Sequence, residues 1–202
     1  MIDKVVKSCY INLRNLRAIA SKLDFSLKKQ LVHCLILSRI DYCNGLFVGL
    51  PENLINKLQK VENACVRFLF GKKIHRFNHV TPYLKEVHFL PVKHRIDYKI
   101  ALLTFKCINN IAPSYLTKLI NIKGELCRSL RNDEDYFLLD VPEVPNYKQT
   151  ERAFSFAAPD TWNKLPYNIR TCCDIDVFKK DLKTLKTLFF FFLFFISSKL
   201  AI

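Results

Sequence analysis

The sequence is poor in glycine and lacks the local motifs of nucleotide-binding and hydrolytic enzymes. Only four of its 202 residues are Gly, which leaves little room for a glycine-rich loop that cradles phosphate. Gly-x-Ser-x-Gly, a Walker A loop, the dinucleotide fingerprint and His-Glu-x-x-His do not occur. The one dense acidic group, at residues 133–135, stands in a polar stretch where a solvated turn is expected. We therefore predict no catalytic site, no cofactor and no small-molecule substrate.

The chain also has no Cys-x-x-Cys pair, although it contains eight Cys and five His. Most of the cysteines stand among apolar residues at helical spacing, where a free thiol behaves as a small hydrophobe. The first residues show no signal-peptide core, so we expect reduced thiols in an intracellular protein of the cytoplasm or nucleus. His75, His79, His88 and His94 have only Glu86 as a further ligand at short spacing, and no metal site is predicted.

Half of the residues are hydrophobic and a quarter are charged, which is typical of a folded chain. Apolar residues recur mostly at helical spacing, and we predict a mainly α fold. The expected helices cover 4–23, 27–38 with Ser26 as N-cap, 51–70 ending at Gly71, 82–87, 91–108, a short helix from Pro113, and a last helix capped by Asp174. Residues 38–45 are expected to be a connector, and 71–79 a basic loop.

The stretch 121–150 predicts an irregular excursion with one short strand at 136–141. The apolar content of 152–166, which includes the single residue Trp162, predicts a packed segment. Leu188–Ile196 is a run of nine apolar residues, six of them Phe. As a helix it spans about 14 Å, too short to cross a hydrocarbon core of about 30 Å. It is either a translated non-coding tract or a shallow membrane anchor with basic flanks.

The positive charge is concentrated in one half of the sequence. The whole chain has 32 basic and 18 acidic residues, whereas residues 1–100 alone have 18 basic and 7 acidic ones. This bias predicts contact with RNA or DNA phosphates without sequence reading. The candidate residues are Lys57, Lys60, Arg67, Lys72, Lys73, Arg76, Lys93, Arg95 and Lys99. The alternative is that they form ordinary solvated faces.

Three collinear blocks of sequence point to a family. The first covers SRIDYCN at 38–44 and continues through LQKVENA at 58–64. The second covers HVTPYLKEVHFLPV at 79–92, HRI at 94–96, LTFKC at 103–107 and APSYL at 112–116. The third covers RAFS at 152–155, WNKLP at 162–166 and FK at 178–179. Together they resemble the region downstream of the polymerase palm in reverse transcriptases of non-long-terminal-repeat retrotransposons, the jockey-like LINE elements of animals.

The resemblance implies a thumb-like helical region at 5–120 and a C-terminal extension at 121–186, followed by the Phe-rich tail at 187–202. In the intact element this region would help to hold primer and template. The family polymerizes DNA with an aromatic-x-Asp-Asp motif, and no Asp-Asp dipeptide occurs in this sequence, so no catalytic residue is carried over. We expect a catalytically inactive reverse-transcriptase fragment with at most non-specific nucleic-acid binding. The alternative is a structural or membrane-associating protein that uses the Phe-rich tail.

Overall fold

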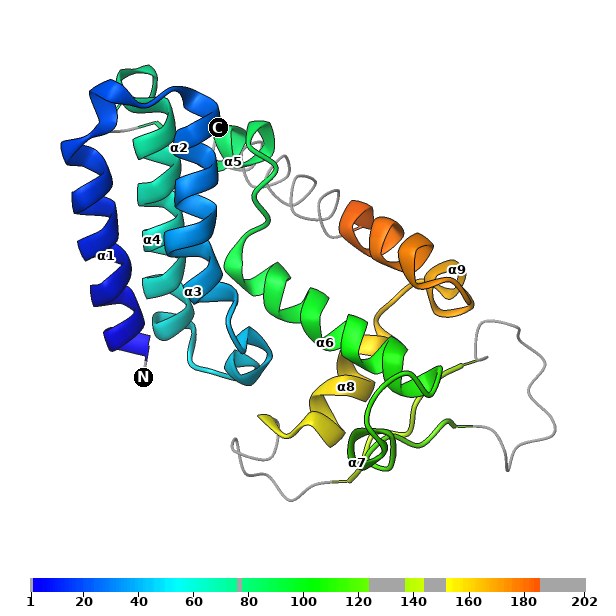
Figure 1. Cartoon of the computed structure of the whole chain (residues 1–202). Helices are drawn as coiled ribbons and strands as arrows, with labels where there is room; N and C mark the ends of the chain where they lie inside the picture. The colour runs from blue at the N-terminus through cyan, green and yellow to red at the C-terminus, as the bar shows by residue number, and fades with distance from the viewer. Residues whose placement is uncertain (1, 76–77, 124–136, 144–151, 186–202) are drawn as a thin grey trace, which may run out of the picture. The chain divides into compact units, whose positions relative to one another are not determined.

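The computed structural model describes residues 2–75, 78–123, 137–143 and 152–185. Over these ranges the chain is mainly helical and contains no strand, which confirms the predicted mainly α class (Figure 1). The chain divides into two compact units, Met1–Arg95 and Ile96–Ile202. The boundary between the two units lies inside one long helix, α6 (Val92–Ile108).

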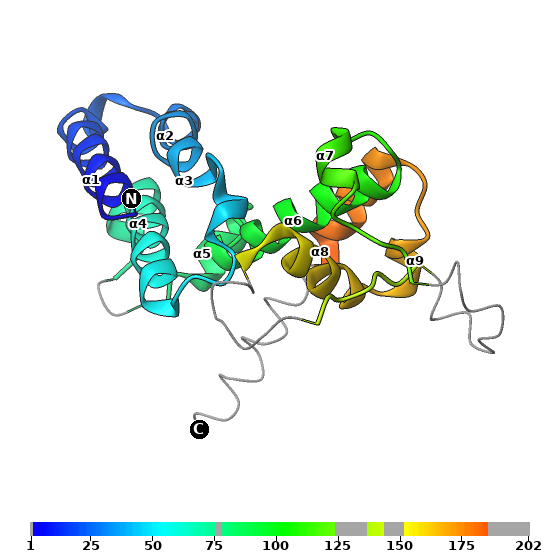
Figure 2. The ribbon, with the colours of Figure 1, turned by 90° about the horizontal axis from the view of Figure 1, so that it is seen from below.

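Unit 1 is built on three long helical stretches that pack side by side. Figures 1 and 2 both show the first helix, the α2–α3 stretch and the fourth helix next to one another. The elements of this unit are α1 (Ile2–Ala18), η1 (Ala20–Lys22), α2 (Phe25–Val32), the π-helical η2 (His33–Leu37), α3 (Ser38–Asp41), η3 (Asn44–Phe47), α4 (Glu52–Phe70), η4 (Gly71–Lys73) and α5 (Thr81–Glu86).

The core of unit 1 follows the apolar periodicity of the sequence. Leu13 of α1 and Leu58, Val61 and Cys65 of α4 are completely buried, because residues three and four apart share one face of a helix. Helix α4 ends where it was predicted to end. Gly71 follows Phe70 with a φ of 55°, a left-handed conformation that Gly adopts without steric penalty.

Two local predictions in unit 1 are wrong. The N-cap of α2 is Asp24 and not Ser26, because the Asp24 carboxylate accepts a hydrogen bond of 2.9 Å from the N–H of Leu27. Residues 38–41 are helical and not a connector. The wider π-helical turn of η2 shifts the apolar period by about one residue, which looks like a break in the sequence. The chain then leaves the helix at Cys43, whose φ is 52°.

Unit 2 contains most of α6 (Val92–Ile108), then α7 (Ser114–Thr117), α8 (Phe154–Asn163), α9 (Tyr167–Arg170) and a helical stretch at 175–185. Helix α6 ends at the predicted place, and Asn110 follows with a φ of 56°. Asp174 caps the last helix as predicted: its carboxylate accepts hydrogen bonds from the N–H groups of Asp176 and Val177, at 2.7 and 2.9 Å. These two bonds hold the pKa of Asp174 below its usual range.

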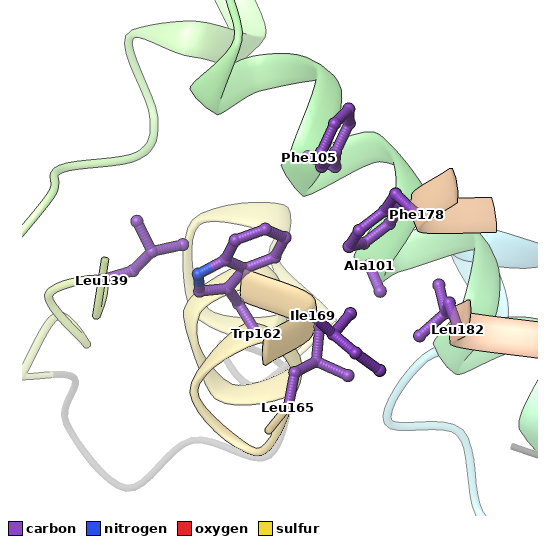
Figure 3. Packing of buried hydrophobic residues seen from close by; sticks show 8 residues of the cluster. All are labelled: Ala101, Phe105, Leu139, Trp162, Leu165, Ile169, Phe178 and Leu182. Atoms are coloured by element: carbon purple, nitrogen blue, oxygen red, sulfur yellow. The ribbon is translucent and has the colours of Figure 1, made fainter. Parts of the chain in front are cut away.

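Aromatic side chains from three segments form the core of unit 2 (Figure 3). The rings of Phe105 and Phe178 stack with their centroids 4.3 Å apart, and Trp162 stacks on Phe178 at 5.8 Å. Trp162 is 1% exposed, which confirms that its segment is packed. Its indole N–H donates a hydrogen bond of 2.8 Å to the carbonyl of Phe137, so the one polar atom of the ring is satisfied.

The predicted strand at 136–141 is absent from its described part, residues 137–141. Leu139 makes only an isolated antiparallel bridge with Ile122. On its other edge the side chain of Asn163 takes the place of a partner strand, because it accepts from the N–H of Leu139 and donates to its carbonyl, both at 2.9 Å. A side-chain amide thus satisfies the backbone that a ladder would otherwise pair.

The remaining expectations concern the membrane and the thiols. Within the ranges given above, no helix is long and apolar enough to cross a membrane. The Phe-rich run and Cys127 lie outside the described residues. The other seven cysteines are free. Burial raises the pKa of the Cys9 thiol above its usual range, and it raises the pKa of the Cys65 thiol to about 12. These two thiols are therefore protonated at neutral pH and pack as apolar groups, as their sequence context predicts.

Candidate nucleic-acid interface

The nine candidate residues do not form one exposed set. Lys57, Lys60, Lys73 and Lys93 are exposed residues of unit 1, and Lys99 is an exposed residue of unit 2. Lys72 lies in η4, but its side chain is not described, and Arg76 lies outside the described residues. The guanidinium groups of Arg67 and Arg95 are hydrogen-bonded within unit 1.

Helix α4 places two of the lysines on its solvent side. Lys57 and Lys60 lie away from the buried stripe that contains Leu58 and Val61. The Lys57 ammonium is 2.7 Å from an Asp3 carboxylate oxygen of α1, and this contact lowers the pKa of Asp3. The side chains of Lys57 and Asp3 are 46% and 75% exposed. An ion pair with this exposure is weak and exchanges readily with water or another anion.

A hydrogen bond brings the lysines of α4 and α6 into the same part of unit 1. The N–H of Val92 donates to the side-chain oxygen of Gln59 at 3.0 Å. Lys60 and Lys93 each follow one of these two residues in the sequence and are exposed. Their backbones therefore lie close together although 33 positions separate Gln59 from Val92.

Arg67 of α4 is hydrogen-bonded to the chain that follows η4. Its guanidinium donates to the carbonyl of His75 at 3.1 Å and to that of Asn78 at 2.9 Å. These two bonds fasten the chain that follows η4 to the last turns of α4. The group that was predicted to contact phosphate thus organises the loop that carries Lys73.

Arg95 lies at the centre of a buried polar network. Its two terminal nitrogens donate to Glu62 at 2.7 Å and to both carboxylate oxygens of Asp41 at 3.0 Å, and its Nε donates to the carbonyl of Leu90 at 2.6 Å. The Arg95 side chain is 12% exposed and that of Glu62 is completely buried. We call Arg95, Glu62, Asp41 and Gln59 the Arg95 network. Its guanidinium is satisfied by the protein and is not part of an exposed basic surface.

The buried environment of Glu62 raises the pKa of its carboxyl group. Burial raises the pKa of Glu62 to about 7, whereas the Arg95 guanidinium and the Gln59 amide act to lower it. A carboxyl group that titrates near neutrality is typical of catalytic sites. Here one carboxylate oxygen accepts from Arg95 and the other accepts from Gln59 at 2.9 Å. Glu62 is also inaccessible to solvent, and its bonds hold the middle of α4 to the start of α6.

The candidate set left out a basic face of unit 1 that α1 carries. Lys4, Lys7, Arg14 and Arg17 of α1 are all exposed. The signal was present in the sequence, because their spacing of three and seven places them on one side of the predicted helix.

No protein-family model, curated protein or solved structure matches the chain significantly. The likeness to non-long-terminal-repeat reverse transcriptases therefore stays a prediction from the three sequence blocks.

Proposed function

We propose that this chain is a non-catalytic helical module of retrotransposon reverse-transcriptase origin that binds nucleic acid without reading its sequence. The observation that carries the proposal is the exposure of Lys57, Lys60, Lys73 and Lys93 in unit 1. Residues 1–95 contain 17 basic and 6 acidic side chains. Such an excess attracts the phosphate backbone at long range and binds it through counterion release.

The types of side chain favour phosphate contact over base recognition. Arginine reads guanine by donating two hydrogen bonds in a fixed geometry. Within the candidate set the two described arginines, Arg67 and Arg95, donate instead to groups of unit 1. The exposed candidates are lysines, whose compact charge on a flexible stem suits a phosphate but carries little sequence information.

The proposal assigns no catalytic activity to these residues. A two-metal polymerase needs paired carboxylates, and the Asp-Asp motif of the resembled family has no counterpart in these 202 residues. Glu62, whose pKa is raised to about 7, has both oxygens bonded within the Arg95 network. We therefore propose that these residues do not polymerize nucleic acid by themselves.

Binding measured against salt tests the proposal. The full chain is titrated onto a labelled oligonucleotide by fluorescence anisotropy between about 50 and 200 mM salt, where each phosphate contact contributes about 0.7 to 0.9 to the slope of log K against log salt. A variant with Lys57→Gln, Lys60→Gln and Lys93→Gln is expected to have a slope that is shallower by about 2 to 3.

The matched control removes the same charge from unit 2 through Lys118→Gln, Lys164→Gln and Lys180→Gln. All three of these lysines are exposed, and Lys164 pairs with Asp160 at 2.6 Å much as Lys57 pairs with Asp3. This variant is expected to keep the slope of the wild type. Wild-type protein that binds no nucleic acid at about 50 mM salt would refute the proposal.

A further inference from the structure

The solvent side of α1 carries a stripe of cations that the candidate set does not contain. Lys7, Tyr10, Arg14 and Arg17 follow one another at spacings of three, four and three, and Lys4 comes one turn before them. All five are exposed. We call these five residues the α1 stripe. At 1.5 Å per residue the stripe extends over about 20 Å.

The rest of unit 1 holds the α1 stripe toward solvent. Cys9, Leu13 and Leu16 occupy the opposite side of α1 and are buried. On that side α1 packs against α4 and η2. Within unit 1 both ribbon views show α1 with these helices along one side and none along the other (Figures 1 and 2). The stripe is therefore fixed in direction by a packed core and does not depend on a mobile loop.

The charge of the α1 stripe is not neutralised within unit 1. Asp3 is the one acidic residue of α1, and it pairs with Lys57 of α4. Lys4, Lys7, Arg14 and Arg17 form no ion pair within the described ranges. Like charges three residues apart destabilise a helix, and cations near its N-terminus oppose the helix dipole. A local conflict of this kind is expected where a surface serves a partner of opposite charge.

The exposed ring of Tyr10 favours single-stranded nucleic acid over a duplex as the ligand of the stripe. Its side chain stands between Lys7 and Arg14 on the stripe, and 41% of the residue is exposed. A base of a single strand can stack on such a ring while the flanking cations hold the neighbouring phosphates, whereas the bases of a duplex are already stacked. We infer that the α1 stripe binds single-stranded nucleic acid, with its cations on the phosphates and the Tyr10 ring against a base. The inference rests on the proposed function, adds the α1 stripe to its contact surface and names single-stranded nucleic acid as its substrate.

Two variants of the full chain separate charge from stacking. Lys7→Gln with Arg14→Gln is expected to reduce the salt slope on oligothymidylate of about 20 nucleotides by about 1.4. Its control, Lys118→Gln with Lys180→Gln, removes two exposed cations of unit 2 and is expected to leave the slope unchanged. Tyr10→Ala is expected to weaken binding to oligothymidylate about fivefold, and Tyr10→Phe to preserve it. On a duplex of the same length, Tyr10→Ala is expected to bind like the wild type.

The outcomes keep the inference and the proposed function apart. Absence of salt-dependent binding to both oligonucleotides refutes the proposed function. Normal binding by the Lys7/Arg14 variant, or an equal effect of Tyr10→Ala on single strand and duplex, refutes only the inference. The protein is also tested on vesicles of phosphatidylserine. If it binds them and oligothymidylate does not displace it, the α1 stripe binds membranes, and this result also refutes the inference. Unchanged far-ultraviolet circular dichroism confirms that each variant is folded.

Discussion

Replacement of Arg95 by Ala tests the Arg95 network most directly. The guanidinium joins segments that are far apart in the sequence, because it bonds Asp41 after the π-helical turn, Glu62 in the middle of α4 and the carbonyl of Leu90 before α6. It also lies 6.0 Å from the centre of the Phe89 ring, within range of a cation–π interaction. The substitution removes all of these bonds and leaves two carboxyl groups without their cation.

The burial of the partners sets the size of the effect. The Glu62 side chain is 0% exposed and that of Asp41 is 33% exposed, so water can solvate Asp41 but not Glu62. Removal of one partner from a buried ion pair costs about 3–5 kcal/mol. A domain of this size has a free energy of unfolding of about 5–15 kcal/mol. Arg95→Ala is therefore expected to remove a large part of the stability of unit 1.

The effect also depends on pH. The pKa of Glu62 in the folded protein is about 7, above its ordinary value of 4.5, so the folded state binds the proton more tightly than the unfolded state. The contribution of Glu62 to stability is complete below pH 4.5 and decreases as the pH rises through 7. At about 1.4 kcal/mol per unit, the decrease amounts to about 3 kcal/mol. Because Arg95 acts to lower this pKa, Arg95→Ala extends the decrease to higher pH, whereas the onset near the unfolded-state pKa of 4.5 stays the same.

Urea unfolding of the full chain, followed by circular dichroism at several pH values, measures both effects. Lys57→Ala is the matched control, because it removes an exposed ion pair worth at most about 1 kcal/mol. Glu62→Gln is expected to abolish the decrease in stability between pH 4.5 and 7. If Arg95→Ala unfolds at the same urea concentration as Lys57→Ala, or if Glu62→Gln keeps the pH dependence of the wild type, the account of the Arg95 network is wrong.

Two further predictions concern single contacts. Asp24→Ala is expected to destabilise the protein by about 1 kcal/mol through loss of the α2 N-cap, whereas Ser26→Ala has no such effect, and thermal unfolding distinguishes the two. Trp162→Ala is expected to cost about 3–5 kcal/mol because it empties the centre of the unit 2 core. Trp162→Phe keeps most of the ring and loses the bond to the Phe137 carbonyl, so its urea midpoint is expected to lie between those of the wild type and Trp162→Ala.

The helices that could be predicted are those whose signals are local. The stripe of α4, its end at Gly71 and the Asp174 cap each depend on residues within a turn or two of one another, and the structure has them where the pattern places them. The predictions of the α2 N-cap and of a break at residue 38 failed, because at both places the sequence is compatible with a second local structure. Asp24 and Ser26 are both good N-caps, and the π-helical turn at His33–Leu37 disguised a continuing helix as a break.

The candidate interface shows the same division. The excess of basic residues in the first half is a property of composition, and the exposure of Lys57 and Lys60 follows from their place opposite the buried stripe of α4. The α1 stripe could have been found in the same way, because its spacing is helical. By contrast, the sequence has no signal that Arg95 is buried, since its acidic partners lie 33 and 54 positions away.

The sequence by itself determined the mainly α class, most helix positions, the aromatic core segment around Trp162 and the sign of the charge, because each depends on near neighbours or on composition. Only the tertiary structure decided which cations are free. Arg67 bonds the loop after η4, Arg95 bonds Glu62 and Asp41, and the cations of α1 have no ion-pair partner among the described residues. The physical reason is that a charge is neutralised by whatever lies within a few ångströms in space, and only folding brings distant residues that close.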